Sequence, residues 1–240
     1  ASSVACLGEL GRYPTYIKAW TLAFKYWMRL EKGTKNTLLN YAYKLEKQER
    51  SWWYDGIANI IRETGFGNLV NNECVISNNH VGSLAKQFEQ RLKDQWVQIW
   101  HAKMNEFVHV QHCINTEKNY KRADYLDILH NGNIRNLVTK LRIGYNNLGY
   151  SVKTNTMKCP KCENDYETLE HVLLQCNAYK NARIALFEKI KSAKYCYYYF
   201  SLSSKDQIKS LLELSGDCIL ADLRTDICYY IKCINDILNI

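Results

Sequence analysis

Apolar residues recur at intervals of three and four along most of this chain, which is the spacing of one face of an α-helix. The clearest example follows Pro14 and comprises Ile17, Trp20, Phe24, Trp27 and Leu30. The same periodicity predicts further helices over residues 36–49, 51–63, 84–113, 122–131, 133–148, 178–194 and 217–239. Only 2 prolines and 11 glycines interrupt the chain. We therefore expect a mostly α protein, a multi-helix bundle.

Each predicted helix has a face that should be buried. In the helix over residues 36–49, the residues expected to point inward are Leu38, Leu39, Ala42 and Leu45. In the last helix, the apolar positions again alternate at three and four, as in a bundle or a coiled-coil face. We expect this last helix to pack inside the fold rather than to form a dimer zipper.

The polar, turn-rich stretch over residues 71–83 is the best candidate for a boundary or an exposed loop. The chain has 240 residues, 47% of them apolar, which is enough to bury a substantial core. We expect four segments: N-terminal helices over 1–70, a long helix and a basic helical part over 83–150, a cysteine-rich part over 151–194, and C-terminal helices over 195–240.

The net charge of +8 is unevenly distributed. Residues 1–50 carry nine Lys and Arg against four Asp and Glu, and residues 117–158 carry eight against three. On the first predicted helix, the basic residues share the face opposite the apolar stripe, and they are Lys18, Lys25, Arg29 and Lys32. Local positive charge suits a polyanion, because each cation that neutralises a phosphate releases counterions. A solvated protein surface is the alternative interpretation of the same residues.

The stretch CPKCENDYETLEHVLLQC combines the residue types that bind soft metal ions. Two residues separate Cys159 from Cys162, and four separate His171 from Cys176 around a predicted helix that starts near Thr168. Both spacings let a ligand pair converge on one ion. Three thiolates and one imidazole favour tetrahedral Zn²⁺, with iron as the less suitable ion. Four protein ligands leave no position for water or substrate, so the sequence predicts a structural zinc site.

The other cysteines stand mostly alone on apolar faces, where a thiol behaves as a small hydrophobe. A disulfide framework, as in a secreted protein, is the competing interpretation of the 10 cysteines. No apolar run reaches the length of about 18 residues that crosses a bilayer, and the first residues lack the basic start and apolar core of a signal peptide. We expect an intracellular protein, in the nucleus or the cytoplasm, with no membrane partner. His109, His112 and Cys113 would form a second metal site only with a fourth ligand from elsewhere.

Three stretches, GELGRYPTYIKAWTLAFKYWMRL, LVTKLRIGYNNLG and CPKCENDYETLEHVLLQCNAYKNAR, together resemble one region of non-LTR (LINE-type, jockey-like) retrotransposon reverse transcriptases and of host proteins derived from them. This region follows the polymerase core, and the resemblance spans most of residues 5–190. It implies a thumb-proximal helical segment followed by a CCHC zinc knuckle with the ligands Cys159, Cys162, His171 and Cys176 and a trailing pair, Tyr179 and Arg183. It also implies RNA or target DNA as a partner, and with it other parts of a reverse transcriptase or ribonucleoprotein.

Polymerase and nuclease chemistry is not expected from this chain. Asp124 and Asp127 lie in a predicted helix, without the hairpin that two-metal polymerase chemistry requires. The residues after 190 show no convincing carboxylate and lysine set for a nuclease. We therefore expect a protein without catalytic residues of its own.

The sequence thus predicts a zinc-stabilised module that binds and positions RNA or DNA. The expected phosphate contacts, among which those of residues 135–142 should face outward, are Arg12, Lys18, Lys25, Arg29, Arg135, Lys140, Arg142, Lys158, Lys161 and Arg183. Nucleobases would stack on Tyr166 or Tyr179. One alternative is a helical protein–protein interaction scaffold braced by a structural zinc. Another is an enzyme in which His109 and His112, or His101 and Asp94, act as acid and base.

Overall fold

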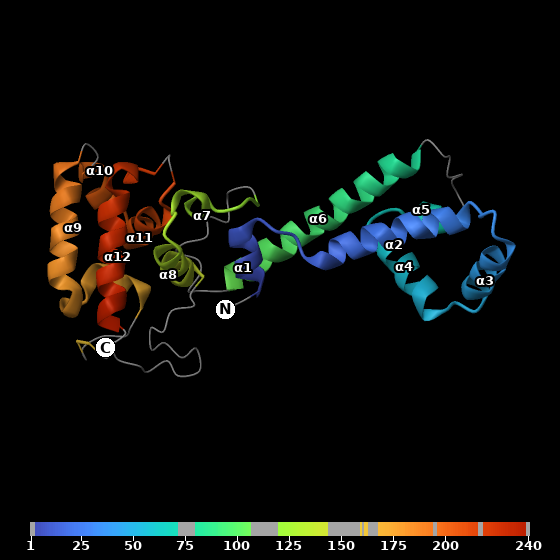
Figure 1. The fold of residues 1–240 in the computed structure, drawn as a ribbon, viewed down its shortest axis with the longest axis horizontal. Helices are drawn as coiled ribbons and strands as arrows, with labels where there is room; N and C mark the ends of the chain where they lie inside the picture. The colour runs from blue at the N-terminus through green and yellow to red at the C-terminus, as the bar shows by residue number, and fades with distance from the viewer. Residues whose placement is uncertain are drawn as a thin grey trace. The chain divides into compact units, whose positions relative to one another are not determined.

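The computed structural model describes residues 3–71, 80–106, 120–143, 159, 161–162, 168–193, 196–215 and 218–238. Helices make up the regular structure of these ranges, and no strand occurs among them (Figure 1). The predicted mostly α class is confirmed. Within the same ranges, no helix combines the length and the apolar character that would carry it across a membrane.

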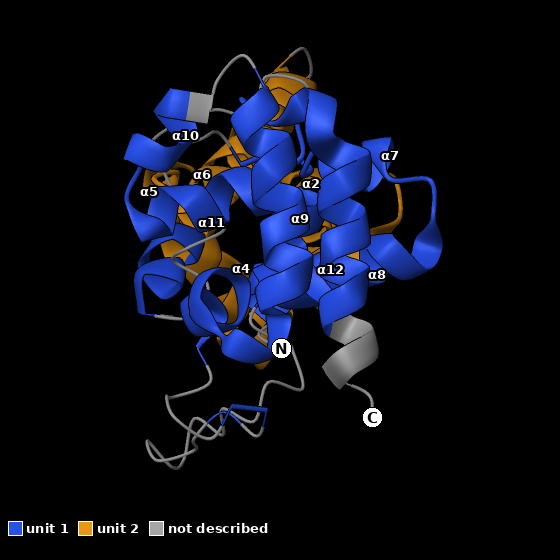
Figure 2. Cartoon of the chain, turned by 90° about the vertical axis from the view of Figure 1, so that its left-hand side faces the viewer, with its two compact units in different colours: residues 1–12, 100–240 blue, residues 13–99 orange. Residues whose placement is uncertain are grey.

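The chain divides into two compact units (Figure 2). Unit 1 comprises residues 1–12 and 100–240, and unit 2 comprises residues 13–99. The long helix α6 (Val81–Glu106) contributes residues to both. The four segments predicted from local sequence features divide the chain at other positions, and they stay a prediction.

Unit 2 is built from α2 (Thr15–Glu31), α3 (Thr37–Gln48), α4 (Trp52–Glu63), α5 (Gly67–Val70) and the first part of α6. The predicted apolar stripe of α2 faces its core, where Phe24 and Trp27 have no exposed surface. The ring of Phe24 stacks on that of Phe88 from α6, with 4.2 Å between the centroids. Phe66 lies 6.0 Å from both rings. An aromatic cluster therefore joins α2 to α6.

Helix α4 ends at Glu63, as the sequence predicts, and the turn that follows explains why. Gly65 has a φ of +87°, a left-handed conformation that glycine adopts at little cost. The amide of Gly65 donates to the carbonyl of Arg62, and that of Phe66 donates to Ile61. These two bonds form a Schellman motif, which satisfies the last carbonyls of the helix and turns the chain away.

Helix α3 is rotated relative to the prediction. Leu38 and Leu45, which were expected to point inward, are 75% and 41% exposed, and Ala42 is exposed as well. The buried residue is Tyr43, whose hydroxyl donates to the Glu31 carboxylate at 2.6 Å. The expectation for Leu38, Ala42 and Leu45 is therefore wrong, because a buried tyrosine and its hydrogen bond, rather than the leucines, decide which face of α3 meets the core.

Unit 1 contains α1 (Ser3–Leu10), α7 (Tyr125–Ile128), α8 (Gly132–Arg142), α9 (Lys180–Ser192), α10 (Cys196–Ser201), α11 (Ser204–Glu213) and α12 (Arg224–Leu238). Three short turns, η2 (His171–Gln175), η3 (Asn177–Tyr179) and η4 (Ala221–Leu223), complete its helical structure. Helix α12 packs against α8 and α9, and α11 packs against α8 and η2. Ile227, Tyr230 and Ile234 of α12 are almost fully buried, so the expectation of a packed terminal helix is confirmed.

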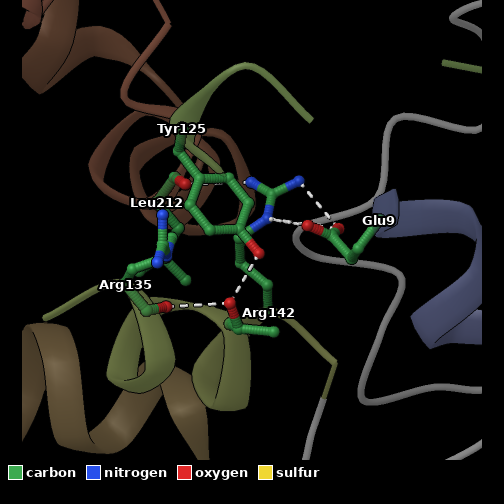
Figure 3. A network of polar contacts seen from close by, with 6 residues as sticks. Glu9, Tyr125, Arg135, Arg142 and Leu212 are labelled. Carbon is green, nitrogen blue, oxygen red and sulfur yellow. Dashed lines mark hydrogen bonds and ion pairs between the residues drawn. The ribbon is translucent and has the colours of Figure 1, made fainter. Parts of the chain in front are cut away.

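A buried ion pair joins α1 to α8 within unit 1 (Figure 3). The guanidinium of Arg142 donates to both carboxylate oxygens of Glu9, at 3.0 to 3.2 Å, and to the carbonyl of Leu212 at 2.9 Å. It also lies 4.9 Å from the centre of the Tyr125 ring. Burial raises the pKa of the Tyr125 phenol well above its usual value. Arg142 is only 7% exposed, so the prediction that it faces outward is wrong.

Candidate metal centre

Four side chains of unit 1 bring their ligand atoms together at one point. The Sγ atoms of Cys159, Cys162 and Cys176 and a ring nitrogen of His171 all lie within 4.8 Å of one another. The Sγ atoms of Cys159 and Cys176 are 3.8 Å apart, and Sγ of Cys162 is 3.3 Å from Nε2 of His171. The predicted group of four ligands is therefore assembled in the folded chain.

Two distances within the group match those of a tetrahedral metal site. Bonds of about 2.3 Å to sulfur and about 2.0 Å to nitrogen place two sulfurs about 3.8 Å apart and a sulfur about 3.5 Å from the nitrogen. The two short distances in the group are close to these values. Cys159 and Cys176 are fully buried, His171 is 3% exposed, and Cys162 is half-buried. A soft cation held here would be largely shielded from water.

A π-helical turn positions two of the four ligands. The amide of Cys176 donates to the carbonyl of His171 at 2.6 Å, five residues back, and residues His171–Gln175 form the π-helical turn η2. In an α-helix, residues five apart point about 140° away from each other. The wider π turn brings them to the same side, and such turns occur frequently at functional sites. The hydroxyl of Thr168 accepts from the amide of His171 at 3.0 Å, so the helical segment that leads into η2 begins near Thr168, as the sequence predicts.

The backbone around the ligands is held by two side chains from other helices. Arg183 of α9 donates to the carbonyl of Cys176 at 2.9 Å and to that of Gln175 at 3.2 Å. The hydroxyl of Tyr230 in α12 donates to the carbonyl of Leu173 at 2.6 Å. Carbonyls at a helix end lack partners within the helix, and these two side chains supply them. They fix the backbone that carries His171 and Cys176, as the groups around metal ligands commonly do.

Burial of the thiols decides what a metal ion would have to displace here. Burial, and after it the neighbouring thiol of Cys159, raises the pKa of the Cys176 thiol to about 12. Three sulfurs at this distance become thiolates together only when a positive ion compensates their charge. Metal binding at this site would therefore displace protons from the thiols, and its affinity would depend on pH.

Arg183 is a correction to the sequence prediction, since it was expected to contact phosphate. It is 8% exposed, and its guanidinium is engaged by the carbonyls of Gln175 and Cys176. Arg142 is likewise removed from the predicted phosphate contacts by its ion pair with Glu9. Tyr179, predicted as a stacking platform for bases, is 1% exposed and belongs to the core. Arg142 and Arg183 have structural roles because each has a hydrogen-bond partner inside the fold.

The other predicted contacts differ in exposure. The exposed ones are Arg12, Lys18, Lys25 and Arg29. The half-buried ones are Arg135, Lys140 and Lys161. Arg135 donates to the carbonyl of Leu126 at 3.3 Å. The predictions for Lys158, Tyr166, His109, His112 and Cys113 lie outside the described residues. Asp94 accepts from Gln90, and the ring of His101 lies against that of Trp100.

Comparisons with family models, with curated proteins and with solved structures find no match for this chain. The class that the described residues define is a helical protein with a buried group of three cysteines and one histidine that could hold a metal ion.

Proposed function

We propose that the Cys159, Cys162, His171 and Cys176 group holds a zinc ion with a structural role. Soft thiolates with one imidazole in tetrahedral order suit zinc better than magnesium or calcium. Because all four positions come from the protein, no site remains for water or substrate. The ion fastens the segment around Cys159 and Cys162 to η2 and to the core of α9, α11 and α12. The proposal assigns no catalytic residue to the chain.

We propose further that the chain is a nucleic-acid-binding module, and the observation that carries this is the outer face of α2. Lys18, Lys25 and Arg29 are exposed at intervals of seven and four, which places them on one side of the helix. Glu31 is the only carboxylate of α2, and it forms a salt bridge with Lys47 at 2.8 Å and accepts a hydrogen bond from Tyr43. Within α2 itself, these three cations therefore have no carboxylate on their face.

Apolar and aromatic side chains lie among these cations. Leu22 is 56% exposed and Tyr26 is 42% exposed, and both lie within about a quarter turn of Lys18 around the helix. Cations that contact phosphates, together with aromatic rings on which bases stack, are the usual elements of a surface for single-stranded nucleic acid. We therefore favour RNA or single-stranded DNA over a duplex. Origin from a retrotransposon reverse transcriptase, which the sequence motifs suggest, belongs to the same proposal.

The salt dependence of binding tests the nucleic-acid proposal. The equilibrium constant for binding a fluorescent single-stranded RNA, and a DNA of the same sequence, is measured between about 50 and about 400 mM salt, where counterion release changes the affinity. We expect the triple variant Lys18→Gln, Lys25→Gln, Arg29→Gln to reduce the slope of log K against log salt by about 2. Lys86→Gln, Arg91→Gln, Lys103→Gln on α6 is the matched control, since it removes the same charge from other exposed positions.

The same experiment shows which result would contradict the proposal. If binding did not change with salt, or if the α6 control lost as much affinity as the α2 variant, the outer face of α2 would not be the contact surface.

Metal content is measured separately, by elemental analysis of the purified protein. We expect one zinc ion per chain. If the protein were folded without bound metal, the proposed structural role of zinc would be wrong.

A further inference from the structure

The outer face of α3 is apolar and unlike that of an ordinary surface helix. Leu38, Tyr41 and Leu45 are 75%, 63% and 41% exposed. Their spacing of three and four places them in one strip along the helix. A single exposed apolar residue is common on proteins, whereas several gathered in one strip form a candidate binding surface.

This strip is presented on a helix whose orientation is already fixed. On the opposite side of α3, the hydroxyl of Tyr43 and the ammonium of Lys47 both donate to Glu31, at 2.6 and 2.8 Å. The side chain of Asn36 caps the helix by accepting from the amide of Leu39 at 3.1 Å. Because the helix is formed and anchored, a partner would not have to order it on binding.

The strip also has the register of a coiled-coil seam. With Leu38 and Leu45 at heptad position a and Tyr41 at d, the buried Tyr43 falls at f, which is opposite the seam. In this register Lys44 occupies position g and Glu49 position e. Both side chains are exposed, and Glu49 keeps a helical backbone with φ −77° and ψ −4°. Two opposite charges thus flank the strip at the positions that set the choice of partner.

The charges select a second copy of the same chain. In a parallel pair of helices, the g residue of one faces the e residue of the following heptad on the other, so Lys44 would face Glu49 of the second copy, twice by symmetry. In an antiparallel pair of copies, Lys44 would face Lys44. The other e position is Ala42, which is small enough for close approach.

We propose that the protein self-associates through α3, with Leu38, Tyr41 and Leu45 meeting the same residues of a parallel second copy and Lys44 facing Glu49 across the seam. The helix has only 12 residues, so the interface is small. Interfaces at the small end of the range are reversible, and a dissociation constant on the order of 10–100 μM is expected. The association is independent of the proposed nucleic-acid binding, since it needs no RNA or DNA.

Sedimentation equilibrium of the full chain, without nucleic acid, measures this association. The mass should rise from 28.1 kDa towards twice that value with increasing concentration. The double variant Leu38→Lys, Leu45→Lys should keep the monomer mass at every concentration. Ile184→Lys on α9, a position 47% exposed and outside both proposed surfaces, is the control and should dimerise like the wild type. Circular dichroism confirms that each variant keeps its helical content.

A charge swap tests the parallel register. Lys44→Glu or Glu49→Lys alone should weaken the dimer about tenfold, because two attractive pairs become repulsive, and the double variant should restore it. The proposal would be overturned if the wild type stayed a monomer at every concentration. It would also be overturned if the leucine variants on α3 still formed the dimer, or if the double charge variant did not regain the dimer affinity of the wild type. A monomeric protein whose α3 variants lose RNA binding would assign the strip to nucleic acid and overturn it as well.

Discussion

The cations of α2 in unit 2 and two arginines of α8 and α9 in unit 1 follow similar patterns in the sequence but differ in burial. Lys18, Lys25 and Arg29 are exposed, whereas Arg142 and Arg183 are nearly buried. The difference lies in what stands opposite each cation. Arg142 forms an ion pair with a carboxylate, and Arg183 donates hydrogen bonds to two backbone carbonyls. Helical spacing places a basic residue on a face, but only the partner from another element decides whether that face is buried.

Metal removal should have the largest effect, and it should affect the two units differently. Cys176→Ser should reduce bound zinc from one per chain to none, and small zinc sites contribute about 10–16 kcal/mol to folding. Amide hydrogen exchange should therefore accelerate in η2 and α9, while α2 keeps its protection. Cys233→Ser, at a half-buried thiol outside the group, is the control. Equal protection of η2 with and without metal would contradict the structural role of the ion.

Loss of the guanidinium at Arg142 should have the next largest effect. Arg142→Met leaves the Glu9 carboxylate buried without its partner, which costs about 3–5 kcal/mol of unfolding free energy. Arg29→Met on α2 should change it by no more than about 0.5 kcal/mol. Urea unfolding of both variants measures the difference. Equal values would mean that the contrast between buried and exposed cations has no energetic basis.

Arg183 tests the contrast between buried and exposed cations a second time, because its guanidinium holds the backbone that carries His171 and Cys176. Arg183→Met removes the donors to Gln175 and Cys176 and should cost about 2–3 kcal/mol. It should also weaken zinc binding about 10- to 100-fold, as loss of a group behind a metal ligand does. Competition with a chromophoric chelator measures the affinity. A variant that is destabilised but binds zinc normally would limit Arg183 to packing.

The smallest effect is expected from a single hydroxyl. Tyr230→Phe leaves the buried carbonyl of Leu173 without its donor, at a cost of about 1–2 kcal/mol. Tyr229→Phe, one residue earlier and 69% exposed, should be neutral. Thermal unfolding of the two variants resolves the difference, and a neutral Tyr230→Phe would show that the hydroxyl does not brace η2.

Local features of the sequence predict much of the fold and the whole group of candidate ligands. The period of the apolar residues predicts α2, α4 and α12, because their buried stripes are long and uninterrupted. The tight spacing of Cys159 and Cys162 and the second pair at His171 and Cys176 predict the site, because few other arrangements explain such a cluster.

What the sequence does not predict depends on contacts between distant residues. Glu9 lies 133 residues before Arg142, so nothing local reveals that this arginine is buried. The π turn at η2 is equally hidden, since its residues fit an α-helical pattern. For α3, four apolar residues outnumber Tyr43, yet Tyr43 is the buried one, because its ring lies against Trp53 and Tyr54 and its hydroxyl donates to Glu31. Only a signal of pairing between distant positions would have identified these contacts.

The ion pair between Glu9 and Arg142 has a consequence for biosynthesis. At about 5–20 residues per second, about 7–27 s pass on the ribosome between the appearance of the acid and that of its base. Unit 2, whose residues 13–99 are contiguous, emerges complete during that interval. Helix α1 must therefore remain without this partner until α8 has been synthesised, and a chaperone that acts on α1 would act in that interval.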